Sequence, residues 1–167
     1  MSDTLITVIA IGLAAVLMFV FPLMTMSDRA NDVSQTSLKT TVDNFVQDIK
    51  NTGVITKAKY DNFIASLPAQ NRYDVELEVW VLDENPGKKV NQTNSKIIGE
   101  NVYYCEYTSQ IENKLKSGNY ILKEGDIIKV SAKNTNQTIS DQLSPLPNAD
   151  ISTQSAESSG TVTVNGK

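Results

Sequence analysis

The N-terminal segment constrains this chain most, because a long apolar run begins directly after Asp3. Between Thr4 and Ser27 no side chain is charged, and nearly all of the residues are apolar. A helix of about 20 such residues crosses the ~30 Å hydrocarbon core of a bilayer. Only helices and closed barrels satisfy their backbone groups there. The remainder of the chain is polar. We therefore expect residues 1–27 to form an apolar transmembrane or assembly helix that carries a water-soluble head.

The flanks of this segment differ from those of a cleavable signal peptide. No basic residue precedes it, and no small-x-small cleavage site follows it. The nearest basic residues, Arg29 and Lys39, lie on its C-terminal side, where the positive-inside rule would place the head in the cytoplasm. Asp28 and Asp32 share that flank, so the charge bias is weak and the topology stays open.

The composition argues against several classes of function. The formal net charge is −4 and no basic stripe is present, whereas a nucleic-acid-binding surface needs clustered Lys and Arg. The chain has no His, which is the commonest general base and metal ligand. The pattern of a calcium-binding loop is also missing. We therefore expect a protein that is not an enzyme, with no cofactor, no metal and no nucleic-acid partner.

The polar part of the chain begins with a helical pattern. No Gly or Pro interrupts residues 28–51, and Gly53 is a typical helix stop. We therefore expect one long helix, apolar in its first half and amphipathic in its second, with a kink at Pro22. Large apolar residues recur on one face of the second half, and we expect them to face the head: Leu38, Val42, Phe45, Val46 and Ile49.

The patterns predict a small α+β head that spans residues 28–134 and includes the second half of the long helix. Thr56 caps a short helix that Pro68 ends, and Ser109 with Glu112 forms a capping box for another that Gly118 ends. Alternating apolar and polar residues predict an antiparallel sheet, with strands at 73–82, 102–107 and 127–133. We expect a turn at 85–87 and a loop or irregular hairpin at 88–100.

The last segment, 135–167, is rich in Ser, Thr, Asn and Gln, which predicts a poorly ordered tail or a wrapping segment. Within it, Thr161–Val164 is expected to form a late strand. The sequons at Asn91 and Asn136 match the glycosylation pattern, but such matches arise by chance in a chain rich in Asn and Thr.

Alternation on the strand at 73–82 places Trp80 and the acidic residues Asp74, Glu76 and Glu78 on the outward face. We interpret the acidic residues as solubilising rather than as a cation site. An exposed Trp is typical of a subunit contact, although a loop or the tail could cover it equally well. Cys105, the single cysteine, is expected to be a half-buried structural thiol.

The order of these elements resembles that of type IV pilins and pseudopilins, in which a long N-terminal helix precedes a small antiparallel sheet. Pro22 lies where many mature pilins carry a helix-kinking proline. Three runs resemble the head of TadE-like minor pilins of tight-adherence systems: NTGVITKAKYDNFIASL, YDVELEV and EGDIIKVSAKN. The resemblance covers most of the chain up to Asn134.

This resemblance implies a structural subunit that its apolar helix holds in the membrane before assembly. The helices of many copies, or of related pilins, then pack into the core of an extracellular filament with the heads outward. Leu5 stands where many pilins carry a glutamate that pairs with the neighbouring subunit's N-terminal amine, and Asp3 is the nearest possible substitute. Met1 is either the initiator or a residue exposed by leader cleavage.

Small side chains let apolar helices approach closely, and Ala10 and Ala14 form a small-xxx-small pair. We therefore expect the apolar helix to be the assembly interface. Two alternatives stay open, namely a simple membrane anchor and a single-pass interaction protein of a secretion or conjugation apparatus. The residues expected at the interface are Asp3, Leu5, Ala10, Gly12, Ala14, Ala15 and Pro22.

Overall fold

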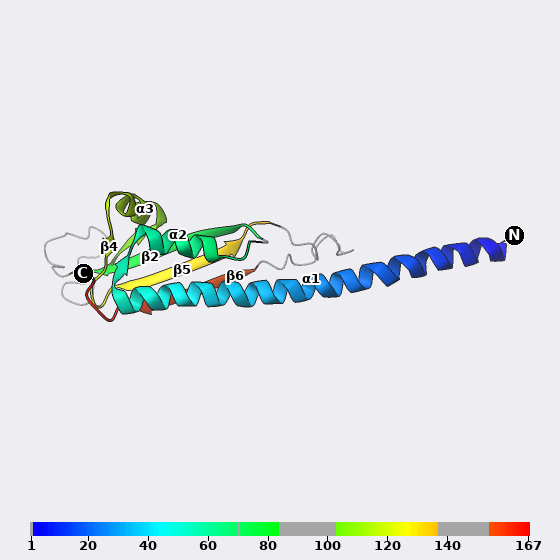
Figure 1. The fold of residues 1–167 in the computed structure, drawn as a ribbon, viewed down its shortest axis with the longest axis horizontal. Coiled ribbons are helices and arrows are strands. Elements are labelled where there is room, and N and C mark those ends of the chain that lie inside the picture. Colours follow the sequence, from blue (N-terminus) through cyan, green and yellow to red (C-terminus); the bar gives the residue numbers. More distant parts are fainter. Residues whose placement is uncertain (1, 70, 84–102, 137–153) are drawn as a thin grey trace, which may run out of the picture.

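The computed structural model describes residues 2–69, 71–83, 103–136 and 154–167. The fold is α+β, as expected: a long N-terminal helix, α1 (Ser2–Thr52), accompanies a small antiparallel sheet. The second half of α1 lies along the head, whereas the first half projects well beyond it (Figure 1). The molecule is therefore elongated, with the apolar end of α1 far from the sheet.

The helix α1 is continuous from its apolar half into its amphipathic half. It runs through Pro22, which has no N–H to donate to the carbonyl of Met18. Figure 1 shows a gently curved helix with no sharp break. The sharp kink predicted at Pro22 is therefore absent, and the helix only curves gently there. The backbone remains helical on both sides of the missing hydrogen bond.

The stop of α1 at Gly53 is confirmed. The φ angle of Gly53 is 66°, a left-handed conformation that a residue with a Cβ adopts only at a cost, and its N–H donates to the Ile49 carbonyl at 2.7 Å. The C-terminal segment also passes close by. A Cβ at Gly53 would lie 2.6 Å from the Gly166 nitrogen and 2.7 Å from the Val164 carbonyl oxygen. This position therefore requires glycine for both conformation and space.

A four-stranded antiparallel sheet forms the centre of the head, in the order β3-β2-β5-β6. Its strands are β2 (Tyr73–Leu82), β3 (Tyr103–Tyr107), β5 (Ile127–Asn134) and β6 (Ser155–Thr161). A two-stranded ladder, absent from our expectations, joins β1 (Val54–Ile55) to β4 (Tyr120–Ile121). The remaining helices are α2 (Lys57–Ser66) and α3 (Thr108–Ser117).

One hydrophobic core lies between the helices and one face of the sheet. The apolar face predicted for the second half of α1 is buried there, and Phe45 stacks on Phe63 of α2 with 4.3 Å between ring centroids. Inward-facing residues of β2, β5 and β6 complete the core: Leu77, Val79, Ile128, Val130, Ala132 and Ala156. The opposite face of the sheet bears the acidic residues of β2, as alternation predicted.

The late strand is present, but our position for it was wrong. It spans Ser155–Thr161, whereas Val162 and Thr163 donate their N–H groups to the carbonyls of Asp126 and Lys50. The strand consists mostly of small residues, with one charged residue, Glu157, and one buried Ala. Its conformation comes from pairing with β5 and contact with α1, which override its weak β-propensity. The C-terminal residues 154–167 are therefore part of the head.

The helix α3 does not begin with the expected capping box. Tyr107 is its N-cap residue, and the Tyr107 N–H donates to the Gln110 side chain at 3.0 Å. Glu112 instead accepts a hydrogen bond from Tyr60 of α2 at 3.0 Å. By contrast, the Thr56 cap of α2 is confirmed, because its side chain accepts from the Lys59 N–H.

Several expectations fall outside the described residues. They are the turn at 85–87, the loop at 88–100, Asn91, and Val102 at the start of the strand that we find as Tyr103–Tyr107. The first part of the expected tail, 137–153, also lies outside them.

We predict that Gly53→Ala destabilises the head strongly. The left-handed conformation costs an L residue roughly 1–2 kcal/mol, and the clash with the Gly166 and Val164 backbone adds to this. Thermal unfolding of the detergent-solubilised full chain, followed by circular dichroism, measures the effect. Gly118→Ala is the matched control, because nothing lies within 4 Å of its added Cβ and its backbone is extended. Equal melting temperatures for the two variants would contradict the prediction.

Candidate functional site

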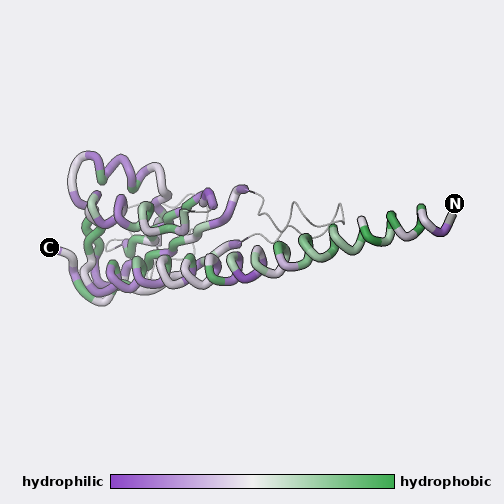
Figure 2. Tube along the Cα trace, turned by 45° about the vertical axis from the view of Figure 1, so that its right-hand side comes forward, coloured by the Kyte–Doolittle hydropathy of each residue, from purple (hydrophilic) through white to green (hydrophobic). Residues whose placement is uncertain are grey.

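The candidate site is the projecting half of α1, which presents apolar side chains in all directions. An 18-residue window there has a mean hydropathy of 2.7, and none of it is buried, so the helix is long and apolar enough to span a membrane. Among its exposed large side chains, the exposed fraction ranges from 47% for Leu17 to 76% for Met18, whereas Val20 and Met24 are partly buried. Figure 2 shows this apolar character along the N-terminal part of the helix. So much exposed apolar surface marks an interaction surface.

The threonines of this segment are compatible with an apolar environment. The Thr7 hydroxyl donates to the Asp3 carbonyl at 2.7 Å, and the Thr25 hydroxyl donates to the Phe21 carbonyl at the same distance. Because the donors are satisfied within the helix itself, these side chains can enter lipid or a helix bundle without losing a hydrogen bond.

All seven residues expected at the interface lie exposed on α1, but helical geometry does not bring them onto one face. With 3.6 residues per turn, residues seven positions apart lie on nearly the same side of a helix. Six of the residues form three pairs at this spacing: Asp3 and Ala10, Leu5 and Gly12, and Ala15 and Pro22. The seventh, Ala14, lies one turn from Ala10 and joins the first pair.

The first of these groups forms a narrow strip of small residues. Thr7, Ala10 and Ala14 follow one another at intervals of three and four, so they share a face with Asp3. Gly12 lies about 200° around the helix from Ala10 and belongs to the opposite side. We define the small strip as Thr7, Ala10 and Ala14. Our sequence reasoning missed Thr7, although its i, i+3 spacing to Ala10 was the available signal.

A polar cluster holds α1 where it leaves the head. Gln154 is buried, and its side-chain oxygen accepts from Asn71 at 2.7 Å and from the Tyr73 hydroxyl at 3.1 Å. The Gln154 amide nitrogen donates to the Asn31 carbonyl of α1 at 3.2 Å. Ser34 adds a contact of 3.2 Å with the Tyr73 hydroxyl. The cluster thereby joins the start of the C-terminal segment and β2 to α1, and it fixes the direction in which the apolar half departs.

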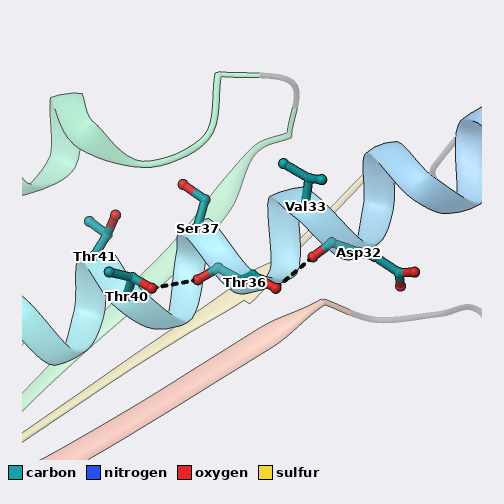
Figure 3. Close-up of a pocket in the computed structure, with 6 residues that line it drawn as sticks. All are labelled: Asp32, Val33, Thr36, Ser37, Thr40 and Thr41. Atoms are coloured by element: carbon teal, nitrogen blue, oxygen red, sulfur yellow. Dashed lines mark hydrogen bonds between the residues drawn. The ribbon is translucent and has the colours of Figure 1, made fainter.

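The outward side of α1 within the head carries a shallow depression (Figure 3). Its Thr36 and Thr40 hydroxyls donate to the carbonyls of Asp32 and Thr36, each at 2.9 Å. These bonds occupy the hydroxyl hydrogens, and the Thr36 hydroxyl donates to the main-chain carbonyl of Asp32 and not to its exposed carboxylate. The lining residues are Asp32, Val33, Thr36, Ser37, Thr40 and Thr41. We interpret the depression as helix surface and not as a catalytic site.

Two clusters of titratable side chains tie α3 to its neighbours. Glu106 of β3 accepts from Tyr120 at 2.8 Å and pairs with Lys114 of α3. Burial, followed by the hydrogen bond to Glu112, raises the pKa of Tyr60 from 10.0 to about 12. Within the described residues, no group of three His, Cys, Asp or Glu side chains is placed to hold a metal ion.

The outer face of the sheet holds the other two residues that the sequence singled out. Trp80 is 43% exposed, as alternation predicted. Cys105 is half-buried, which confirms its expected environment, and burial raises the pKa of its thiol. A raised pKa favours the unreactive protonated form over the thiolate. Cys105 therefore has the character of a structural thiol.

We predict that the free energy of unfolding falls as the pH rises from 10 to 12, in part through Tyr60. The folded state holds the Tyr60 proton more tightly than the unfolded state, so this contribution is complete below pH 10 and is lost through about pH 12. Tyr60→Phe should flatten the decline, and Glu112→Gln should reduce it partly. Urea unfolding at several pH values measures the slopes. A Tyr60→Phe slope identical to that of the unmodified chain would contradict the assignment.

Comparisons with protein-family models, with curated proteins and with solved structures find no match to this chain. A functional interpretation therefore depends on the geometry of α1 and the head.

Proposed function

We propose that this chain is a pilin-like structural subunit, anchored in a membrane before assembly and polymerising through α1 into an extracellular filament. One observation carries the proposal: the apolar half of α1 projects from the head, and the side chains of residues 3–19 are exposed all round the helix. Residues 4–26, at about 1.5 Å per residue, extend for about 35 Å. This length covers the ~30 Å hydrocarbon core of a bilayer.

The same helical surface suits both states of such a subunit. Fully burying a large apolar side chain contributes roughly 1.5–3 kcal/mol relative to leaving it in water, so the isolated segment is unfavourable in an aqueous environment. Lipid covers this surface before assembly, and the equivalent helices of other copies cover it afterwards. No change in the head is needed for the transfer between the two environments.

The rigid connection between helix and head favours an assembly helix over a simple anchor. The helix continues from the apolar half into the core of the head, where Leu38, Val42 and Val46 are buried. The polar cluster around Gln154 adds a second attachment at the point of departure. Packing of the apolar halves would therefore fix the positions of the heads, whereas an anchor alone could function with a flexible linker.

The small strip supplies a surface for close helix packing. Thr7, Ala10 and Ala14 let a neighbouring helix approach more closely than Leu or Phe would allow. In this proposal Asp3 takes the place of the glutamate that many pilins carry, because it shares a face with Ala10. Leu5 lies on the opposite side and contributes apolar contact.

A second candidate is a single-pass membrane protein whose head binds a partner within a secretion or conjugation apparatus. The exposed Trp80 on the outer face of the sheet favours it, because aromatic residues are enriched at interface cores. The two candidates differ in what contacts the apolar half of α1. In the filament subunit it contacts other copies of α1, whereas in the membrane-anchored interaction protein it contacts lipid alone.

Electron microscopy of sheared cells separates these candidates. Filaments that carry this chain, identified with gold-labelled antibody in the released fraction, are the result that the proposal predicts. Retention of all of the protein in the membrane pellet would contradict it and favour the anchored interaction protein.

We predict that Ala14→Leu lowers the yield of released filament about tenfold, because overpacking a close contact costs roughly 1–3 kcal/mol and 1.4 kcal/mol corresponds to a factor of ten. Quantitative immunoblotting of the sheared fraction measures the yield. Ala15→Leu is the matched control, because it adds the same side chain about 100° around the helix, and a smaller loss is expected. Membrane content and head stability should stay unchanged, and an unaltered yield for Ala14→Leu would refute packing through the small strip.

A further inference from the structure

The outer face of the sheet, defined as the side turned away from the hydrophobic core, has an ordered pattern of charge. Along β2 it presents the acidic residues Asp74, Glu76 and Glu78, and along β5 it presents Lys129 and Lys133. The two strands are neighbours, so an acidic column lies directly beside a basic column. The alternating side chains on the other side of β2 and β5 are those of the core.

The end of this face near the β2 C-terminus is apolar. Trp80 is 43% exposed and Tyr107 is 57% exposed, and Ile127 lies opposite Trp80 in the register. The outer face therefore combines an aromatic end with a charged end. Exposed aromatic surface beside ordered charge is typical of a contact between proteins.

The register makes this face complementary to itself. Asp74 pairs with Lys133, Glu78 with Lys129 and Trp80 with Ile127, so members of each pair lie at the same level on adjacent strands. A two-fold axis parallel to the strands, between β2 and β5, would superimpose β2 of one copy on β5 of another. Each acidic column would then face a basic column, and each Trp80 would face Ile127 of the second copy.

The same axis is compatible with the membrane segment. The second half of α1 runs along the strands of the sheet (Figure 1), so a rotation about an axis parallel to the strands leaves both α1 helices pointing in the same direction. Both apolar halves could then enter one bilayer. A two-fold axis across the strands would point the helices in opposite directions and would lose the match between the charge columns.

We propose that two copies of this chain pair face to face through the outer faces of their sheets, about a two-fold axis parallel to the strands. This pairing is independent of filament formation, because it uses the head and not the projecting half of α1. Within one copy Lys129 pairs with Glu157 at 3.1 Å, and the second copy's Glu78 adds another carboxylate to this ion pair.

Anchoring in one membrane supports the pairing. Four strands spaced by about 4.8 Å, with about seven residues each, give a face of roughly 19 by 23 Å, which is small for a stable complex in solution. Two heads held in the same orientation by one bilayer experience a higher effective concentration, so that a small complementary face suffices. We therefore expect the pair in membranes.

Cross-linking in membranes tests the arrangement. Two differently tagged full-length copies are prepared, both with Cys105→Ser. One copy carries Glu76→Cys and the other carries Ser131→Cys, because these two positions face each other across the proposed axis. Packed sheets are about 10 Å apart, so a bismaleimide of that span should join them. The control combines Glu76→Cys with Lys39→Cys, an exposed position on α1. We expect at least tenfold more mixed conjugate than in the control, and an equal yield would overturn the proposal.

A charge exchange provides a second test that does not depend on cysteine. Asp74→Lys alone and Lys133→Asp alone should each reduce co-purification of two tagged copies severalfold, because like charges then face each other. Mixing the two variants restores opposite charges between copies, while each chain keeps its unfavourable internal pair. Recovery of co-purification in the mixture is the expected result. No recovery, with both variants folded by circular dichroism, would show that the charge columns do not meet.

Discussion

Burial of the second half of α1 against the sheet joins the two parts of this molecule. Leu38, Val42, Val46 and Ile49 are fully buried, and α1 contacts β5 and β6 along the head. Because the apolar half belongs to the same helix, this packing determines where the apolar half points. The polar cluster around Gln154 acts at the same boundary. A force on the projecting helix is therefore transmitted directly to the core of the head.

The sequence predicted those elements whose signal is local. Periodicity identified the buried face of α1, alternation identified β2, and Gly53 and Thr56 marked a helix end and a helix start. The candidate surface of α1 was also predictable from its composition. The division of the seven expected residues among different faces required only helical geometry, so the small strip could have been defined from the sequence as well.

The elements that the sequence did not predict depend on contacts between distant residues. The strand β6 consists mostly of small residues with no large apolar side chain, and it is extended because β5 and α1 hold it. The ladder of β1 and β4 has two residues in each strand, too few for an alternation pattern. The polar cluster joins Asn31, Asn71 and Gln154, which no local motif connects. Tertiary pairing decided the structure in each of these cases.

The proposed function requires that the apolar half of α1 exchanges lipid for other copies of the same helix. The most direct measurement places a fluorophore on Leu13→Cys, in a Cys105→Ser background, and compares quenching by lipid-bound and by aqueous quenchers. In membranes we expect quenching by the lipid-bound quencher only. In the sheared, released fraction we expect protection from both quenchers. Strong aqueous quenching of the released material, or lipid quenching in every fraction, would contradict the claim.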